Sequence, residues 1–210
     1  MGVDNPLGIK YRVVSEMIYE GEPVRVVSGS ANFETDLDDL WDAVTNPERL
    51  LRWFSPISGE LKLGGKYQLE GNAGGTINRC DPPQALDLTW EFDGNLSWVR
   101  LRLDAQDTGA RLTLEHLMRK DEASEAHWRK YGPGATGVGW DLSFLCLHLH
   151  LRSGQSVSQG ETNAWFETDN GKTFIRECAT SWANAHINSG EDESVANAMA
   201  QRTASFYCGE

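Results

Sequence analysis

The sequence predicts an α+β fold in which a curved antiparallel sheet wraps around one long helix, with an extra helical extension at the C-terminal end. Three observations predict it. Two β-rich segments and two short helical segments come first, a run of short segments with alternating apolar residues follows, and residues 135–152 form a long apolar helical stretch. The run of strands has one apolar face, which the long helix is suited to cover.

Residues 1–23 are expected to form an N-terminal extension that contributes one extra strand. After a loose leader at residues 1–9, the segments 11–19 and 23–33 are typical of two strands joined by a turn at residues 20–22. The centre of the second segment is rich in valine, which suits a pleated surface.

Two short helices are expected next. Thr35 or Asp36 can cap the first one, because a short side-chain oxygen accepts a hydrogen bond from a free N–H of the first turn. The Asn46-Pro47 pair ends this helix, since the residue before a proline is pushed out of the α region. Pro47 can then begin a second short helix that runs to Phe54.

Residues 57–118 are expected to be a meander of strands separated by turns that contain glycine or proline. The clearest strand alternates the apolar Leu86, Leu88, Trp90 and Phe92 with polar residues, which indicates one buried face and one exposed face. Other strands are expected at residues 57–63, 66–70, 76–80, 98–103 and 112–118.

The remaining chain is expected to be mainly helical. A polar stretch at residues 119–130 precedes the long helix, and a linker rich in Gly, Ser and Gln covers residues 153–160. We therefore expect an α+β domain that ends near residue 152 and a helical extension at residues 161–210. The extension either packs on the outer face of the sheet or forms a contact in a homodimer.

The composition and net charge limit the classes of binding partner that we expect. Nineteen Lys and Arg residues against 31 Asp and Glu residues give a net charge of -12, so the basic footprint of a nucleic-acid-binding protein is missing. The same negative charge disfavours an anionic membrane surface. The longest nearly apolar run, residues 138–151, is too short to span a bilayer, which needs about 20 apolar residues.

The four cysteines are far apart and include no CxxC pair, so we expect neither a metal site nor a cofactor. Because the N-terminus lacks a signal-peptide pattern, they are interpreted as reduced thiols of a cytoplasmic protein. Cys146, in the apolar helix, is expected in the core, whereas Cys208, near the end of the chain, is expected to be an exposed thiol.

Several motifs resemble those of the START-like (SRPBCC) helix-grip superfamily, and more narrowly its bacterial branch named after the heat-shock-protein-90 ATPase activator. The motifs that carry the resemblance are Leu40 to Leu50 followed by Trp53-Phe54, Gly64-Gly65-Lys66-Tyr67, Pro82-Pro83, Leu88-Thr89-Trp90, Leu112-Thr113-Leu114 and Gly137 to Leu142. The resemblance implies a curved sheet around a helix over residues 24–152. The superfamily includes lipid carriers, hormone receptors, polyketide cyclases and co-chaperone domains, so the motifs specify the fold more than the function.

A curved sheet that grips a helix encloses a space between them, where small-molecule pockets form. The inward positions of the predicted strands and helix are therefore candidate cavity residues. They are Trp90, Phe92, Leu101, Leu114, His116, Trp140, Phe144 and His148. A cavity of at least about 300 Å³ is required for a typical small-molecule ligand.

Three residues are candidates for acid–base chemistry. His116 lies on the apolar face of its strand and is either a general base or a hydrogen-bonded core histidine. Asp141 and His148 are seven residues apart on one helix, so they share a face and could form an acid–base pair. Alternatively, Asp141 faces solvent near the helix N-terminus.

Three functions follow from these observations. The first is a binding module for a small hydrophobic or aromatic molecule. The second is a cyclase-, dehydratase- or hydrolase-like enzyme that uses His116, Asp141 or His148. The third is a co-chaperone-like interaction domain; the eukaryotic activators carry a large extra domain that this chain lacks, which argues against chaperone binding.

Overall fold

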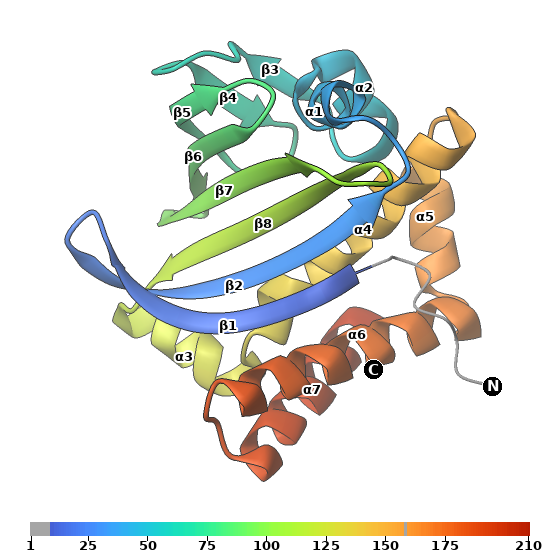
Figure 1. Cartoon of the computed structure of the whole chain (residues 1–210). Helices are drawn as coiled ribbons and strands as arrows, with labels where there is room; N and C mark the ends of the chain where they lie inside the picture. Colours follow the sequence, from blue (N-terminus) through green and yellow to red (C-terminus); the bar gives the residue numbers. More distant parts are fainter. Residues whose placement is uncertain (1–8, 158) are drawn as a thin grey trace.

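One antiparallel sheet organises the structure, a computed structural model that describes residues 9–157 and 159–210. Its strands in this part of the chain are β1 (Ile9–Tyr19), β2 (Glu22–Phe33), β3 (Ile57–Gly59), β4 (Lys66–Leu69), β5 (Gly74–Asp81), β6 (Ala85–Phe92), β7 (Asn95–Ala105) and β8 (Ala110–Arg119). They lie in the order β1-β2-β8-β7-β6-β5-β4-β3 (Figure 1). The chain thus returns from the far edge of the sheet to place β8 beside β2.

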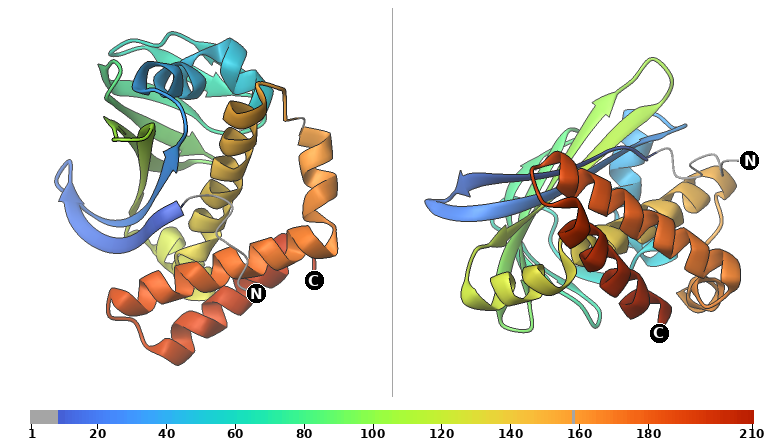
Figure 2. Two further views of the ribbon diagram at one scale, coloured as in Figure 1. Left: turned by 45° about the vertical axis from the view of Figure 1, so that its right-hand side comes forward. Right: turned by 90° about the horizontal axis from the view of Figure 1, so that it is seen from below.

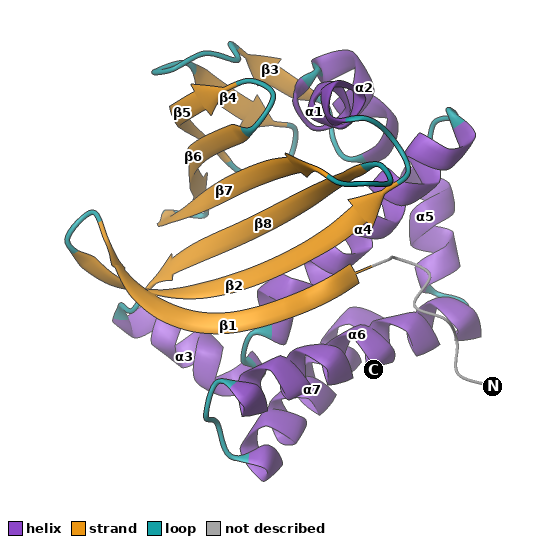
Figure 3. Cartoon of the chain, viewed as in Figure 1, coloured by secondary structure: helices purple, strands orange, loops and turns teal. Residues whose placement is uncertain are grey.

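The helices lie at one end of the sheet and on its concave side (Figure 3). Within the described residues they are α1 (Leu37–Thr45), α2 (Pro47–Trp53), α3 (Glu122–Tyr131), α4 (Gly134–Ser153), α5 (Gln159–Phe166), α6 (Asp169–Asn188) and α7 (Glu193–Cys208). None of these helices is both long enough and apolar enough to cross a membrane.

The concave face of the sheet is built from alternate residues of the strands. In β6, Leu86 and Leu88 face inward, and β7 pairs with it so that Leu101 and Val99 lie beside them. The β6–β7 connection is a tight turn in which Asp93 has a φ of 49° and Gly94 a φ of 76°. Two consecutive positive φ angles match the right-handed twist of the flanking strands, which keeps the two strands in register.

Local capping fixes α1 and α2 where the sequence predicts them. The side chain of Asp36 accepts a hydrogen bond from the backbone N–H of Asp39 at 2.8 Å. Asn46 ends α1, and its side chain accepts from the N–H of Glu48 at 2.9 Å, so the same residue caps the start of α2. This pair of helices closes one end of the space between the sheet and α4.

Helix α4 packs on the concave face of the sheet (Figure 2), as the sequence predicts for the long apolar helix. Gly29 of β2 allows this close approach, since a Cβ atom at that position would lie 3.2 Å from the ring of Phe144. The α4 helix ends at Gly154, whose φ of 66° is the left-handed conformation typical of a glycine C-cap. The predicted α+β architecture, a curved sheet around one long helix, is confirmed.

The last two helices, α6 and α7, form an antiparallel pair beside α4 (Figure 2). Helix α6 packs against α4 and β1, and α7 packs against α6 and α3. The Trp182 ring lies so close to α4 that a Cβ atom on Gly137 would come within 2.2 Å of it, and the same ring reaches Gly29 on the concave face. The C-terminal helices therefore do not pack on the outer face of the sheet, which was one of the two arrangements expected.

Three local expectations differ from the structure. The polar stretch at residues 119–130 contains most of α3, which begins after Asp121, whose side chain accepts from the N–H of Ser124 at 2.8 Å. The strand expected at residues 57–63 ends at Gly59, because a φ of 122° there turns the chain out of the sheet. Helix α5 begins at Gln159, inside the predicted linker.

The cysteines are free in the structure. Cys146 is buried in α4, as expected. The prediction that Cys208 is an exposed thiol is wrong: its side chain is only 7% exposed. The reason is that α7 packs on α6, which brings the Cys208 Sγ atom to 3.9 Å from the Lys172 carbonyl oxygen.

Candidate ligand-binding site

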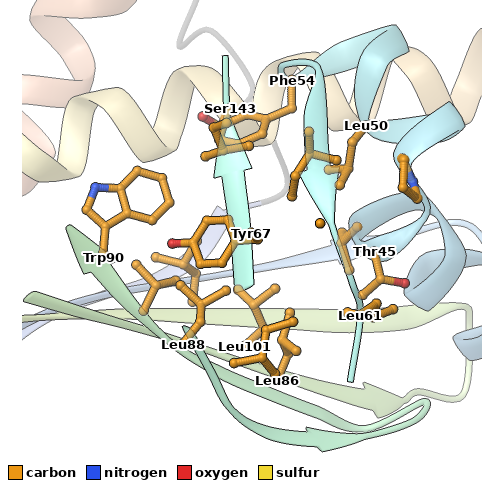
Figure 4. A pocket seen from close by; sticks show the side chains of 18 of the residues that line it. Thr45, Leu50, Phe54, Leu61, Tyr67, Leu86, Leu88, Trp90, Leu101 and Ser143 are labelled. Carbon is orange, nitrogen blue, oxygen red and sulfur yellow. The ribbon is translucent and has the colours of Figure 1, made fainter. Parts of the chain in front are cut away.

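A narrow apolar cavity lies between the concave face of the sheet, α2 and α4 (Figure 4). Its volume is about 120 Å³. An apolar cavity of about 150 Å³ in a protein can take up benzene, so this one suits a single six-membered ring or a short alkyl chain. Its main lining residues are Leu50, Phe54, Tyr67, Leu69, Leu86, Leu88, Trp90, Leu101, Leu114, Trp140 and Phe144.

The polar edge of this cavity is satisfied within the protein. The Tyr67 hydroxyl donates to the Thr89 carbonyl oxygen at 2.7 Å, and its burial raises the pKa of the phenol. Ser143 of α4 donates to the Gly139 carbonyl oxygen at 3.0 Å. These two hydroxyl groups already have acceptors, so the surface offered to a guest is mainly hydrocarbon.

A larger groove lies beside the first half of α4. Its volume is about 720 Å³, and it is bounded by the β6–β7 turn, the end of β8, α3, the first half of α4 and α7. Its walls mix aromatic and polar side chains. They include Asn72, Phe92, Asp93, Asn95, Ser97, His116, His127, Trp128, Tyr131, Thr203, Phe206 and Tyr207.

The cavity and the groove meet at a shared set of side chains. Phe54, Trp90, Trp140 and Ser143 line both of them. The Trp140 ring is stacked on Phe54 with a centroid distance of 6.3 Å and meets Trp90 edge-on at 5.4 Å. The apolar cavity alone is smaller than the roughly 300 Å³ expected of a small-molecule pocket, whereas the groove exceeds that size. A guest of ordinary size would have to occupy both.

His116 lies in the groove wall, within a directed chain of hydrogen bonds. The indole N–H of Trp140 donates to His116 Nδ1 at 3.1 Å. His116 Nε2 therefore carries the proton and donates to Ser97 Oγ at 2.9 Å, and Ser97 donates to the Trp90 carbonyl oxygen at 3.1 Å. Burial lowers the pKa of His116 to about 4, so the ring is neutral at pH 7. Both ring nitrogens are engaged, which matches the hydrogen-bonded core histidine that the sequence left open.

Asp141 lies on the far side of α4 from the cavity and the groove, and lines neither. Its carboxylate pairs with Arg12 Nε of β1 at 3.1 Å and accepts from the indole N–H of Trp182 at 2.9 Å. Burial raises the pKa of Asp141 to about 6, although Arg12 opposes the shift. The alternative that Asp141 faces solvent is wrong, because α6 covers this side of α4 and leaves the residue fully buried.

His148 lines neither the cavity nor the groove. Its ring packs beside Phe33 of β2, with 6.5 Å between the ring centroids, and burial lowers its pKa. It is about 10 Å along the helix from Asp141 at 1.5 Å per residue. The three acid–base candidates thus have separate surroundings: His116 bonds to Trp140 and Ser97, Asp141 bonds to Arg12 and Trp182, and His148 packs beside Phe33.

Apart from His148, the predicted cavity residues divide between the two spaces. Leu101, Leu114 and Phe144 line the apolar cavity, and Phe92 and His116 line the groove. Trp90 and Trp140 line both. Phe92 is half exposed, because it ends β6 at the tip of the hairpin. The sequence analysis did not place residues of α2, β4, α3 or α7 at the cavity or the groove. The Trp53-Phe54 motif, at the end of α2, was the one signal that pointed to any of them.

Two arginines line the groove, and one of them is paired with a carboxylate. Arg25 of β2 forms an ion pair with Glu125 of α3 and places its guanidinium 4.7 Å from the ring of Trp128. The guanidinium of Arg119 lies 5.5 Å from the ring of Trp98. Among residues 9–157 and 159–210, no group of three His, Cys, Asp or Glu side chains could hold a metal ion.

Comparisons with known proteins agree with this architecture. The family model described as "Activator of Hsp90 ATPase homolog 1-like protein" matches residues 34–149. The crystal structure of CalU16 from Micromonospora echinospora is 27% identical, with a TM-score of 0.66 over 83% of this chain and 96% of that chain. Its solution structure gives 28% identity and a TM-score of 0.70 over 86% of this chain and 96% of that one.

A more distant match shows the fold alone. DynU16, described as a protein in the dynemicin biosynthetic locus, is 22% identical, with a TM-score of 0.54 over 62% of this chain and 48% of that chain. None of the curated proteins compared with the chain matches it. The family model covers more than half of the sequence and coincides with α1 to α4 and the strands between them. The chain therefore belongs to the activator of Hsp90 ATPase homolog 1-like family and has the helix-grip fold of the START-like superfamily.

Proposed function

We propose that this protein binds a small hydrophobic or aromatic molecule in the space between the sheet and α4. The observation that carries the proposal is the apolar cavity of about 120 Å³, which shares Trp90 and Trp140 with a groove of about 720 Å³. Protein interiors are normally packed with few voids larger than a water molecule, so an apolar space of this size beside two tryptophans suits a guest.

The chemistry of the lining supports binding rather than reaction. Leu86, Leu88 and Leu101 offer only hydrocarbon, and Tyr67 donates its hydroxyl hydrogen to the backbone. His116, the one acid–base candidate at the groove, uses both ring nitrogens in hydrogen bonds. A guest held here would gain mainly from burial of apolar surface, at about 25 cal/mol per Å².

Titration of the purified protein with ethylbenzene tests the proposal. Because Trp90 and Trp140 line the space, we expect a saturable change in tryptophan fluorescence. The variant Leu88→Phe fills the cavity and should remove the change. Leu149→Phe adds the same ring to an exposed position of α4 and should leave the change intact. A response that does not saturate, or one that Leu88→Phe leaves unaltered, would overturn the proposal.

A further inference from the structure

Helix α7 forms a wall of the groove, although it lies outside residues 34–149, which match the family model. Three side chains of α7 attach it to the end of α3 and the start of α4. Arg202 Nε donates to the Lys130 carbonyl oxygen at 2.5 Å, and the Thr203 hydroxyl donates to the Tyr131 carbonyl oxygen at 2.9 Å. The Tyr207 hydroxyl donates to the Ala135 carbonyl oxygen at 2.8 Å. These bonds hold α7 in a fixed position over the groove.

Phe206 of α7 has no comparable structural role. Its side chain is 67% exposed, yet it lines the groove, and its ring lies 5.7 Å from Tyr131 and 5.5 Å from Tyr207. A phenylalanine left this exposed contributes little to the core, whereas covering it with a guest would bury apolar surface. The three rings form an aromatic wall on the side of the groove away from the apolar cavity.

The polar groups of the groove favour a neutral partner. Arg25 is paired with Glu125 and lies 3.5 Å from Glu16. The Arg119 guanidinium lies 5.5 Å from the Trp98 ring, and its buried Nε atom has no hydrogen-bond partner in the described part of the chain. The carboxylate of Asp93 adds a negative charge to the groove wall. Neutral side chains that can donate and accept hydrogen bonds remain on the walls, such as Asn72, Asn95 and Ser124. The net charge of -12 further disfavours an anion.

From this arrangement we infer that the natural guest has two unlike ends and that Phe206 is a specificity-determining contact for one of them. An apolar end the size of one ring occupies the cavity beside Leu88, and a neutral end rich in hydrogen-bonding groups lies in the groove against Phe206. The inference rests on the proposed function, since it assumes that the apolar cavity holds a guest.

Three probes that share a phenyl group separate the contributions of the two ends of the guest. NMR chemical-shift titration of the protein measures the affinity for each probe. Ethylbenzene has only the apolar end, phenylethyl glucoside adds a neutral polyhydroxyl end, and phenylpropanoate adds an anionic end. We expect the glucoside to bind tightest. Phe206→Ala should weaken glucoside binding by about two- to tenfold, the range of an aromatic contact, and leave ethylbenzene binding unchanged. Val195→Ala, an exposed apolar truncation elsewhere on α7, is the matched control.

The outcomes distinguish this inference from the function on which it rests. If no probe binds, the proposed function itself fails. If ethylbenzene binds but the glucoside binds no tighter, the proposed function stands, and the inference that the guest has two unlike ends is wrong. If phenylpropanoate binds tightest, the inference that the second end of the guest is neutral is wrong. Equal loss of glucoside affinity in Phe206→Ala and Val195→Ala would show that Phe206 is not a contact.

Discussion

Trp140 of α4 donates its indole N–H to Nδ1 of His116 on β8 at 3.1 Å, and this bond joins the gripping helix to the sheet. It also fixes which nitrogen of His116 carries the proton, so that Nε2 can donate to Ser97. Because Ser97 donates in turn to the backbone of Trp90, the two tryptophans that line both the cavity and the groove are held by one chain of hydrogen bonds.

Replacing His116 by Phe should destabilise the protein. The change leaves the Trp140 N–H and the Ser97 hydroxyl without their partner, and an unsatisfied buried polar group costs about 1–3 kcal/mol. We expect a loss of that order in the free energy of unfolding, measured with urea at pH 7. His127→Phe replaces an exposed histidine of α3 and should change little. Equal stability of the His116→Phe variant and the unmodified protein would contradict the hydrogen-bond account.

Acid should reduce the stability difference between the unmodified protein and His116→Phe. The folded-state pKa of His116 is about 4, below its value of 6.5 when unperturbed. Between these pH values the unfolded chain binds a proton at His116 and the folded one does not, so stability falls as the pH falls. Asp141, whose pKa is raised to about 6, has the opposite effect but is present in both proteins and cancels. Urea unfolding at pH 7 and pH 4.5 measures the difference; a difference that stays constant would contradict the neutral buried ring.

Asp141→Asn should weaken the fold without affecting the ligand site. Asp141 is fully buried against Arg12 and Trp182, and loss of one partner of a buried ion pair costs about 3 kcal/mol. Urea unfolding measures this loss, and a double-mutant cycle with Arg12→Gln isolates the pair. Ethylbenzene affinity should be unchanged, since Asp141 lines neither cavity nor groove. A variant of normal stability with altered affinity would show that Asp141 acts at the site.

Gly137→Ala should disrupt the contact between α4 and α6. An added Cβ atom would lie 2.2 Å from the buried ring of Trp182, and such overpacking costs about 1–3 kcal/mol. The matched control is Gly139→Ala in the same helix, where the nearest atom, the hydroxyl oxygen of Tyr207, lies 3.1 Å away. Thermal unfolding should show a lower midpoint for Gly137→Ala than for Gly139→Ala; the reverse order would contradict the packing of Trp182 on α4.

The sequence predicts the fold well where periodicity is strong. Alternating apolar residues from Leu86 to Phe92 predict a strand, and the structure has β6 there. Asp36 and Pro47 predict the starts of two helices, and α1 and α2 begin at these positions. Helix α3 was not predicted, because among its residues only Trp128 is buried, so it lacks an apolar stripe. Its capping residue, Asp121, was the signal available.

The site is less predictable because it depends on contacts between distant segments. That Leu101 and Phe144 face the cavity follows from their positions on the sheet and on α4. The position of Asp141, by contrast, depends on Arg12 and Trp182, which are 129 and 41 residues away in sequence. Phe206 reaches the groove only because α7 folds back onto the end of α3, and no local pattern indicates this.

The most direct test of the account is a crystal structure of the protein soaked with bromobenzene, because anomalous scattering locates the bromine without ambiguity. We predict a bromine peak in the cavity beside Leu88, Trp90 and Phe144, and loss of that peak in Leu88→Phe. A cavity that stays free of bromine at saturating bromobenzene, or one that side chains fill completely, would contradict the claim that the space between sheet and helix holds a guest.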